Sequence, residues 1–239
     1  SRHIVFENET HPDAIALWIV GTYLMDDWIL YPKLYIHSPE RECGKTSLLC
    51  MIEAFACNAR MAASITPSAF NRIIESECPT LLIDEADRTL RGNEELNGII
   101  NAGHTKRTAI RILSEPTPDG KWKSVEMSLW APQVFAGIGT QADTLLSRSI
   151  KISMRRKMVS EKVAAAPLDY FEKQEDLRKS IKSWANQEGK SVAALDVSIP
   201  GIASDRVIDN WKPMFQIANS LGDDWPDKVR VAFNELEVN

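Results

Sequence analysis

The sequence lacks the features that mark several large classes of protein. Its four cysteines (43, 50, 57 and 78) form no CxxC pair and its four histidines are scattered, which disfavours both a zinc site and a disulfide framework. No apolar run approaches the roughly 20 residues that a membrane-spanning helix needs, and the opening SRHIVFENET does not resemble a signal peptide. We therefore expect a cytoplasmic protein with reduced thiols and no membrane partner.

An excess of positive charge is lacking too. The net charge of −5 gives no overall basic footprint of the kind that nucleic-acid-binding domains show, so any DNA contact must come from a local patch. The chain has no internal repeat and no low-complexity tract. Its 239 residues, 44% of them hydrophobic, are enough for one sizeable core and a small second domain.

What the sequence does contain is a phosphate-binding loop. Residues 34–49 read LYIHSPERECGKTSLL, in which a β-rich run, a tight loop and a helical pattern follow one another. This order aims several backbone N–H groups at one point. In such a loop Lys45 reaches the β- and γ-phosphates of ATP, and the Thr46 hydroxyl ligates Mg²⁺. The other residues that we expect to bind the nucleotide are Cys43, Gly44 and Ser47.

The loop departs from the usual pattern at its first position. Pro39 stands six residues before Lys45, where the pattern has Gly, and it fixes φ and removes a backbone donor. Glu40 and Glu42 lie close to the expected phosphates, so we expect their side chains to point away. The alternative is a chance GKT before an ordinary helix.

A second segment supplies the acids that such a loop needs. Residues 79–87 read PTLLIDEAD, and Thr80–Ile83 has the apolar pattern of a buried parallel strand. Ligands bind at the carboxyl ends of such strands, where Asp84 would hold Mg²⁺ through water and Glu85 would polarise the attacking water. The alternative is a pair of solvated acids. A GKT helix together with a strand ending in Asp-Glu favours the nucleotide site.

Strands alternating with helices predict a three-layer α/β domain of the P-loop NTPase type, with a mainly parallel five-stranded sheet. The expected strands are 34–37, 61–64, 80–83, 134–139 and 149–154. The expected helices are 12–25, the helix after the phosphate loop, 67–76 with Thr66 as its cap, 93–102, 140–146, 168–187, 204–221 and 224–236. Residues 106–130 read as an inserted β-hairpin. Pro213 predicts a kink or break near Trp211-Lys212. We place a core domain at 1–157 and a helical domain at 158–239.

Taken in order, four segments resemble one known family. They are SPERECGKTSLL, LLIDEAD, VFAGIGTQADTLLSRSIKISMRR and a helical tail with SDRVIDNWKPMFQIA and GDDW. The chain resembles the phage- and mobile-element-associated P-loop ATPases grouped as DUF3631, over nearly its whole length after residue 12. That group is similar to the AAA+ ATPases and is often found beside primase-like or helicase-like modules. The resemblance implies an AAA+-like fold in which the tail forms a small helical lid.

The resemblance also implies roles for three further residues. Thr140 is the candidate for the polar sensor that touches the γ-phosphate, although the usual Asn is absent. Arg148 occupies the position of an arginine finger that reaches the nucleotide of a neighbouring subunit, which implies a homo-oligomeric ring. Arg206 is the candidate for a second sensor reaching the phosphates from the lid. The alternatives are a helix C-terminal charge for Arg148 and a solvated helix start for Arg206.

The predicted hairpin carries a local basic patch. Helicases related to this group project a hairpin into a central pore, where lysines bind phosphates and an aromatic ring stacks on bases. The alternative is an ordinary solvated hairpin in which Trp122 covers the core. For Trp122 we favour this alternative, whereas for the basic residues a DNA contact and a solvated face are equally open. The basic residues concerned are Lys106, Arg107, Arg111, Lys121 and Lys123.

These patterns predict an Mg²⁺-dependent ATPase that remodels or unwinds DNA during the replication of a mobile element, with a primase or another replication protein as partner. A first alternative is an ATP-dependent switch or loader that acts on a protein and does not move along DNA. A second is a small-molecule phosphotransferase. Glu85 argues against the second, because a water-activating acid favours hydrolysis.

Overall fold

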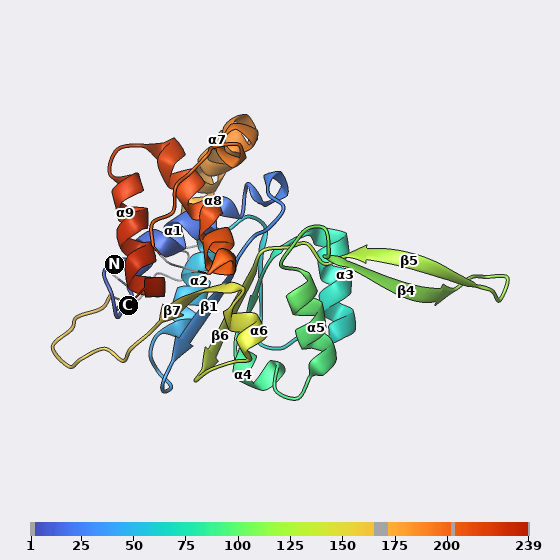
Figure 1. Ribbon diagram of the computed structural model, residues 1–239. Coiled ribbons are helices and arrows are strands. Elements are labelled where there is room, and N and C mark those ends of the chain that lie inside the picture. The colour runs from blue at the N-terminus through green and yellow to red at the C-terminus, as the bar shows by residue number, and fades with distance from the viewer. Residues whose placement is uncertain (1–2, 165–171, 202–203, 239) are drawn as a thin grey trace.

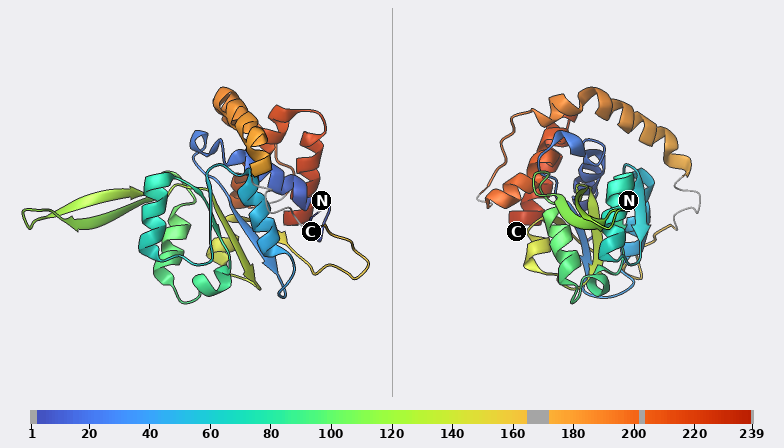
Figure 2. Two further views of the ribbon diagram at one scale, coloured as in Figure 1. Left: turned by 180° about the vertical axis from the view of Figure 1, so that it is seen from behind. Right: turned by 90° about the vertical axis from the view of Figure 1, so that its right-hand side faces the viewer.

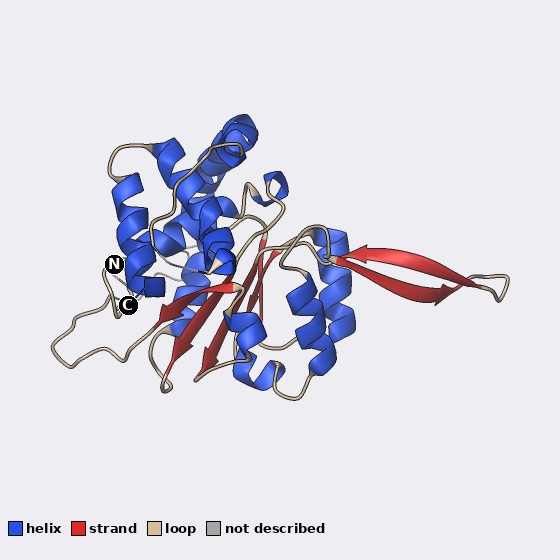
Figure 3. Ribbon diagram, viewed as in Figure 1, coloured by secondary structure: helices blue, strands red, loops and turns tan. Residues whose placement is uncertain are grey.

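The computed structural model describes residues 3–164, 172–201 and 204–238, in which a five-stranded parallel sheet lies between helices and a two-stranded hairpin projects from one side (Figures 1 and 3). The strands are β1 Lys33–Ser38, β2 Ala59–Ala62, β3 Thr80–Ile83, β4 Ile110–Pro116, β5 Trp122–Ser128, β6 Gln133–Ile138 and β7 Ser149–Ser153. The helices are α1 His11–Gly21, α2 Lys45–Phe55, α3 Pro67–Glu77, α4 Ala86–Thr89, α5 Glu94–Ala102, α6 Asp143–Leu146, α7 Glu175–Ala193, α8 Asp205–Leu221 and α9 Trp225–Phe233. Shorter turns are η1 Met25–Asp27, η2 Glu172–Gln174 and η3 Asn234–Val238.

The strand order of the sheet is β2-β3-β6-β1-β7, with every pair parallel. The central strands are buried along almost their whole length, which their continuous apolar runs predict. The connection leaving β1 runs toward β2, whereas the one leaving β6 runs the opposite way, toward β7. Right-handed crossovers then place α2 on one face and α6 on the other, and Figures 1 and 2 show this arrangement. Adjacent strands with connections on opposite faces open a crevice at their carboxyl ends.

The C-terminal helices join α1 in one core. Phe233 of α9 makes edge-to-face contacts with Trp211 and Phe215 of α8, with ring centroids 5.5 and 5.8 Å apart. Gln216 accepts a hydrogen bond of 2.8 Å from Trp28, which precedes β1. The division into domains at residue 157 stays a prediction.

The placement of α8 differs from that of a lid over the phosphate loop. Its first turn contacts Ser147, which precedes β7, whereas the phosphate loop follows the other end of the adjacent strand β1. In the described part of the chain, α8 and α9 pack beside the sheet (Figure 1). The physical reason is the apolar face of α8, which is buried against α1 and α9.

Of the kink or break expected at Pro213, the break is wrong, because α8 runs unbroken from Asp205 to Leu221, whereas the kink stays a prediction. Proline removes one donor, which leaves the carbonyl of Asp209 without its helical partner. Pro213 is buried with Trp211 and Met214, and this packing compensates for the lost hydrogen bond. Helix α7 ends at Ala193 rather than at residue 187, and its expected start at residue 168 lies outside the described residues.

The hairpin forms as predicted, but Trp122 does not cover the core. Its side chain is 71% exposed, so the interpretation that we favoured from the sequence is wrong. The register pairs Pro116 with Trp122 and Ile112 with Glu126, which places Ile110, Ile112 and Trp122 on one exposed face. The other face packs on α3 at its base, where the Ser128 amide donates a hydrogen bond to Glu75.

Candidate functional site

The loop after β1 turns directly into α2. Gly44 caps this helix with a φ of 83°, a left-handed conformation that costs any residue with a Cβ about 1–2 kcal/mol. The substitution of Pro39 for Gly is accommodated, because the left-handed positions of the loop fall at Glu42 and Gly44. The first backbone N–H groups of α2, at residues 45–47, consequently lie at the carboxyl edge of the sheet.

The side chain of Lys45 folds back onto the phosphate loop. Its Nζ donates a hydrogen bond of 2.5 Å to the Ser38 hydroxyl and a weaker one of 3.4 Å to the Glu40 carbonyl. Ser38 in turn donates to the same carbonyl. The ammonium is thus held at the mouth of the loop. We did not identify Ser38 as a site residue from the sequence. Its only signal there is its place, as a hydroxyl residue at the end of the strand that precedes the GKT loop.

The phosphate loop and the end of β3, which are the two parts of the predicted nucleotide site, are in contact. The Thr46 hydroxyl donates a hydrogen bond of 2.8 Å to Asp84 Oδ2, although the two residues are 38 positions apart. Asp84 Oδ1 accepts the Glu85 amide at 2.8 Å, which fixes the carboxylate. A hydroxyl and a carboxylate are the oxygen donors that Mg²⁺ takes when phosphates and water fill its other positions. The pair therefore fits the predicted metal, and the residues described include no His, Cys, Asp and Glu cluster that could hold an ion by itself.

Glu85 lies one residue further on, at the start of α4. Its φ of 48° is a left-handed conformation, which turns the chain sharply after the strand. Its carboxylate forms a 2.8 Å ion pair with Arg88, and both side chains are more than half exposed. Exposed pairs contribute about 0–1 kcal/mol, so Glu85 can leave Arg88 at little cost.

The strand between the two motifs is β6, and Thr140 follows its end. Gly139 has a φ of 73°, and its carbonyl accepts a hydrogen bond of 2.9 Å from Tyr35 of β1. Burial raises the pKa of Tyr35 to about 12, so it stays a neutral donor. Thr140 is exposed at the same edge of the sheet as Lys45 and Asp84. Its role as a sensor stays a prediction.

Glu42 of the loop forms an ion pair with Arg156, in the segment after β7. The expectation that Glu40 and Glu42 point away from the phosphates stays a prediction. Cys43 is buried and directs its thiol to the Arg41 carbonyl at 3.6 Å, whereas Ser47 is exposed in the first turn of α2.

The structure does not bring Arg148 and Arg206 to this edge. Arg148 precedes β7, and its carbonyl accepts the amide of Lys33, the first residue of β1. Strand β1 has six residues, so the phosphate loop lies about 16–20 Å away at 3.3 Å per residue. The Arg206 guanidinium donates to the hydroxyl of Ser147, 3.1 Å away, beside Arg148. Arg148 therefore cannot serve its own loop, and Arg206 does not reach the phosphates from a lid.

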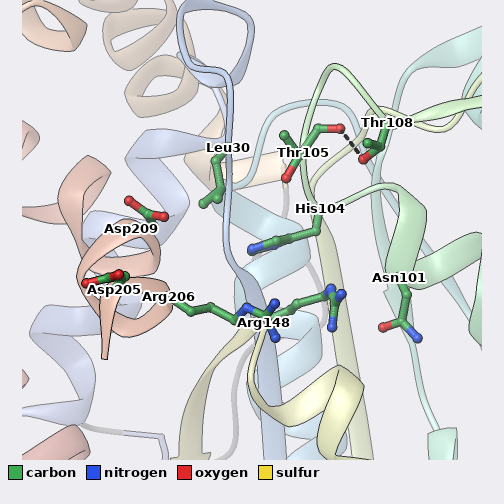
Figure 4. Close-up of a pocket in the computed structure, with 9 residues that line it drawn as sticks. All are labelled: Leu30, Asn101, His104, Thr105, Thr108, Arg148, Asp205, Arg206 and Asp209. Atoms are coloured by element: carbon green, nitrogen blue, oxygen red, sulfur yellow. Dashed lines mark hydrogen bonds between the residues drawn. The ribbon is translucent and has the colours of Figure 1, made fainter. Parts of the chain in front are cut away.

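Both arginines line a pocket of about 460 Å³ at this amino edge (Figure 4). Arg148 also donates a 2.7 Å hydrogen bond to the Thr144 carbonyl of α6, which is the contact that the helix-charge alternative requires. The arginine-finger role stays a prediction. The remaining lining residues are Leu30, Asn101, His104, Thr105, Thr108, Asp205 and Asp209.

The basic residues of the hairpin region fall into two groups. Lys106, Lys121 and Arg111 form ion pairs with Asp26, Asp119 and Glu95 respectively. The second group is exposed and has no ion pair among the residues that the structure describes; it consists of Arg107 and Lys123. A DNA contact stays a prediction, and these two side chains are the freest to make it.

Comparisons with known proteins agree with part of this picture. The sequence profile described as "Protein of unknown function (DUF3631)" matches residues 153–239, from the end of β7 through the C-terminal helices. The profile match thus covers less than half of the chain, a shorter stretch than the resemblance that we stated from the sequence. A search of curated protein sequences found no match. No helix of the described segments is long and apolar enough to cross a membrane.

Two solved structures are similar at a low level. One is the SCCmec type IV Cch protein, described as an active helicase, with a TM-score of 0.46 and 9% identity over 94% of this chain. The other is the C-terminal region of NrS-1, with a TM-score of 0.37 and 11% identity over 97% of this chain. The chain spans 43% and 52% of their lengths. Likeness this weak identifies neither a family nor an activity.

Proposed function

We propose that the chain is an Mg²⁺-dependent ATPase of AAA+-like type that works as a homo-oligomer and remodels or unwinds DNA. The observation that carries the ATPase proposal is the 2.8 Å hydrogen bond between Thr46 and Asp84. It joins the helix after the phosphate loop to the end of strand β3, beside Lys45. A hydroxyl, a carboxylate and an ammonium converging at a helix N-terminus match the needs of a bound triphosphate with its metal.

In this mechanism Lys45 leaves Ser38 and pairs with the β- and γ-phosphate oxygens, while the α2 amides donate to them. Thr46 and Asp84 would hold Mg²⁺, which supplies charge neutralisation on the phosphate oxygens when bound. Glu85 releases Arg88, orients a water toward the γ-phosphate and takes its proton. Thr140, exposed beside β6, donates to the γ-phosphate or to that water. Arg148 acts on the nucleotide of a neighbouring copy, because its own loop is out of reach.

The DNA part of the proposal rests on the hairpin. It projects away from the sheet, and Arg107 and Lys123 are exposed near its base and tip. Trp122 is exposed enough to stack on a base, which contributes about 1–3 kcal/mol per base. Two exposed cations and one aromatic ring suit the backbone and bases of single-stranded DNA.

One observation favours a second function. Ile110 and Ile112 share an exposed face with Trp122, and Glu126 lies opposite Ile112 on the same face. Exposed apolar side chains with a charge among them suit a protein partner, such as a primase or another replication protein. The chain would then be an ATP-dependent switch or loader that engages a protein through its hairpin.

Steady-state ATP hydrolysis with and without single-stranded DNA separates these functions. We expect turnover in the wild type that rises with DNA, is lost in Lys45→Ala, and is unchanged in Lys190→Ala, an exposed lysine of α7. Turnover that is the same with and without DNA would support the switch or loader. Equal turnover in wild type and Lys45→Ala would refute the ATPase proposal.

A further inference from the structure

Two of the four cysteines lie beside each other where strands β2 and β3 begin. Cys57 and Cys78 each stand two residues before their strand, and the register pairs the first residues of these strands, Ala59 and Thr80. The two cysteines therefore hold equivalent positions on adjacent parallel chains, although β2 and α3 separate them in the sequence. Neighbouring strands lie about 4.8 Å apart, within the range of about 4.4–6.8 Å between Cα atoms that a disulfide requires.

Hydrogen bonds across the two strand starts hold this arrangement. The backbone turns at both places, since Asn58 and Cys78 each have a φ of 46°. The Cys57 carbonyl accepts hydrogen bonds from the backbone amide of Thr80, at 3.4 Å, and from its hydroxyl, at 2.6 Å. The side-chain amide of Asn58 donates to the Glu77 carbonyl at 2.7 Å. Because Cys78 lies between Glu77 and Thr80, these contacts keep its backbone beside Cys57.

Both thiols are accessible to a small reagent. Cys78 is exposed and Cys57 is half-buried. The Cys78 thiol contacts the Trp130 carbonyl at 3.5 Å, and a thiol is a weak donor, so this contact is easily exchanged for a covalent bond. Burial raises the pKa of both thiols, and the charge of a Cys78 thiolate raises that of Cys57 further, so the two sulfurs are within reach of each other's charge. At neutral pH both thiols are protonated, and their reaction needs an added oxidant.

The other cysteines and a metal ion do not explain this pair. Cys43 is buried in the phosphate loop, and Cys50 is exposed in the middle of α2. The residues that the structure describes include no group of three or more His, Cys, Asp or Glu side chains that could hold a metal ion, whereas a structural zinc site needs four ligands. Two adjacent thiols without further ligands favour a disulfide over a metal.

A bond between these cysteines would join two elements at the ends that lie away from the phosphate loop. Helix α2 begins at Lys45 and ends two residues before Cys57, whereas β3 begins two residues after Cys78 and ends just before Asp84. The bond would also close β2 and α3 into a covalent loop. Such a loop restricts the unfolded chain more than the folded one, so the oxidised protein should be the more stable form.

We propose that Cys57 and Cys78 form a redox-modification site, at which a low-molecular-weight disulfide such as oxidised glutathione converts the two thiols into an intramolecular disulfide. The thiolate of the exposed Cys78 attacks one sulfur of the reagent and releases a first thiolate. The Cys57 thiolate then attacks the Cys78 sulfur of this mixed disulfide, forms the Cys57–Cys78 bond and releases a second thiolate. The chain loses two electrons and two protons, which the two released thiols gain. This chemistry is independent of the proposed ATPase function.

Oxidation of the folded full chain tests the pair directly. The reduced protein is equilibrated with excess oxidised glutathione, the remaining thiols are blocked with N-ethylmaleimide in acidic urea, and unreduced peptides are mapped by mass spectrometry. We expect one disulfide, between Cys57 and Cys78, with Cys43 and Cys50 blocked by the maleimide. When the same oxidation is done in urea, the pairs Cys43–Cys50 and Cys50–Cys57 should dominate, because shorter loops cost less to close. That contrast would show that the fold selects the pair.

Variants separate a cross-link from simple thiol oxidation. Cys57→Ser should leave a glutathione adduct on Cys78, whereas Cys50→Ser, which removes an exposed thiol of α2, should form the cross-link like the wild type. The oxidised wild type should melt about 5–10 °C higher than the reduced protein, and dithiothreitol should reverse this rise, which Cys57→Ser lacks. Melts of the reduced variants report whether each is folded. Free thiols at excess oxidant, a glutathione adduct on Cys78 of the folded wild type, or disulfides that include Cys43 or Cys50 would overturn the proposal.

Discussion

The two edges of the parallel sheet differ in how their charges are satisfied. At the carboxyl edge, Lys45, Thr46 and Asp84 each have a hydrogen-bond partner from the loop or from each other. At the amino edge, His104 is buried and neither of its ring nitrogens has a hydrogen-bond partner, and the buried Lys33 forms no ion pair among the described residues. The first edge is pre-organised around internal contacts, whereas the second buries an imidazole without hydrogen bonds and an amine without an ion pair. The difference indicates that burial of polar groups costs more free energy at the amino edge than at the carboxyl edge.

The largest effect should come from removing the proposed water-activating acid at the carboxyl edge. Glu85→Gln is expected to lower kcat for ATP hydrolysis by about 100-fold or more, because general-base catalysis contributes about 10²–10⁴-fold. ATP binding should stay within about threefold, since Glu85 acts on water rather than on the phosphates. Hydrolysis and binding assays on the same preparation check this. Glu188→Gln, an exposed position on α7, is the matched control, and normal turnover in Glu85→Gln would assign the base elsewhere.

The cost of burying Lys33 at the amino edge can be measured as stability. Burial, and then the charge of Arg148, lower the pKa of Lys33 to about 7 in the folded chain, whereas its ordinary pKa is 10.5. The unfolded state binds more protons across this window, so stability rises with pH there. Lys33→Met should remove this rise and stabilise the protein at pH 7 and below by ~2–5 kcal/mol, the scale of a shift of several pKa units.

Urea unfolding of Lys33→Met between pH 6 and pH 10 provides the test. Lys190→Met, which replaces an exposed lysine of α7, should keep the wild-type pH profile. If Lys33→Met is less stable than the wild type at pH 6, the folded protein stabilises the charged amine of Lys33. The two edges of the sheet would then not differ in how their polar groups are paired.

A smaller effect is expected from Thr46, the proposed metal ligand at the carboxyl edge. Thr46→Ala removes the hydroxyl bonded to Asp84 and should raise the Mg²⁺ concentration needed for half-maximal hydrolysis by about tenfold, whereas Thr46→Ser should restore it. The measurement is a magnesium titration at saturating ATP. An unchanged magnesium requirement in Thr46→Ala would show that the hydroxyl has only a structural role.

The smallest expected effect concerns the backbone of the loop. Gly44→Ala places a Cβ at a φ of 83° and should destabilise the protein by about 1–2 kcal/mol. Gly98→Ala, in α5 with open space around it, should instead stabilise by about 0.5–1 kcal/mol. Denaturant melts compare the two, and equal effects would mean that the left-handed cap is not required.

The sequence predicted the carboxyl edge better than the amino edge, for a physical reason. Strand Thr80–Ile83 has the bounds that its apolar run predicts, and Thr66 caps α3 through a hydrogen bond from the Ala69 amide, as its Thr-Pro pattern indicates. These signals are local, since helix caps and strand ends depend on a few neighbouring residues. The juxtaposition of Thr46 with Asp84 also followed, because parallel strands meet at their carboxyl ends.

The amino edge could not be predicted, because its residues come from segments more than 40 positions apart. Lys33 looks like an ordinary strand-edge lysine, and His104 follows a helix end with no motif around it. Arg206 was placed at a lid over the phosphates, whereas the packing of α8 on α1 and β7 brings it to the far edge. Trp122 was misassigned for the related reason that its pattern does not say which face of the hairpin packs on α3.

Equilibrium binding of a fluorescent ATP analogue, with and without Mg²⁺, tests the central claim most directly. The account predicts Mg²⁺-dependent binding to the wild type that weakens at least tenfold in Lys45→Ala. In Arg206→Ala at a protein concentration where the chain is monomeric, affinity should stay within about twofold of the wild type. Binding that is indifferent to Lys45 and to Mg²⁺ would contradict a nucleotide site at the carboxyl edge of the sheet.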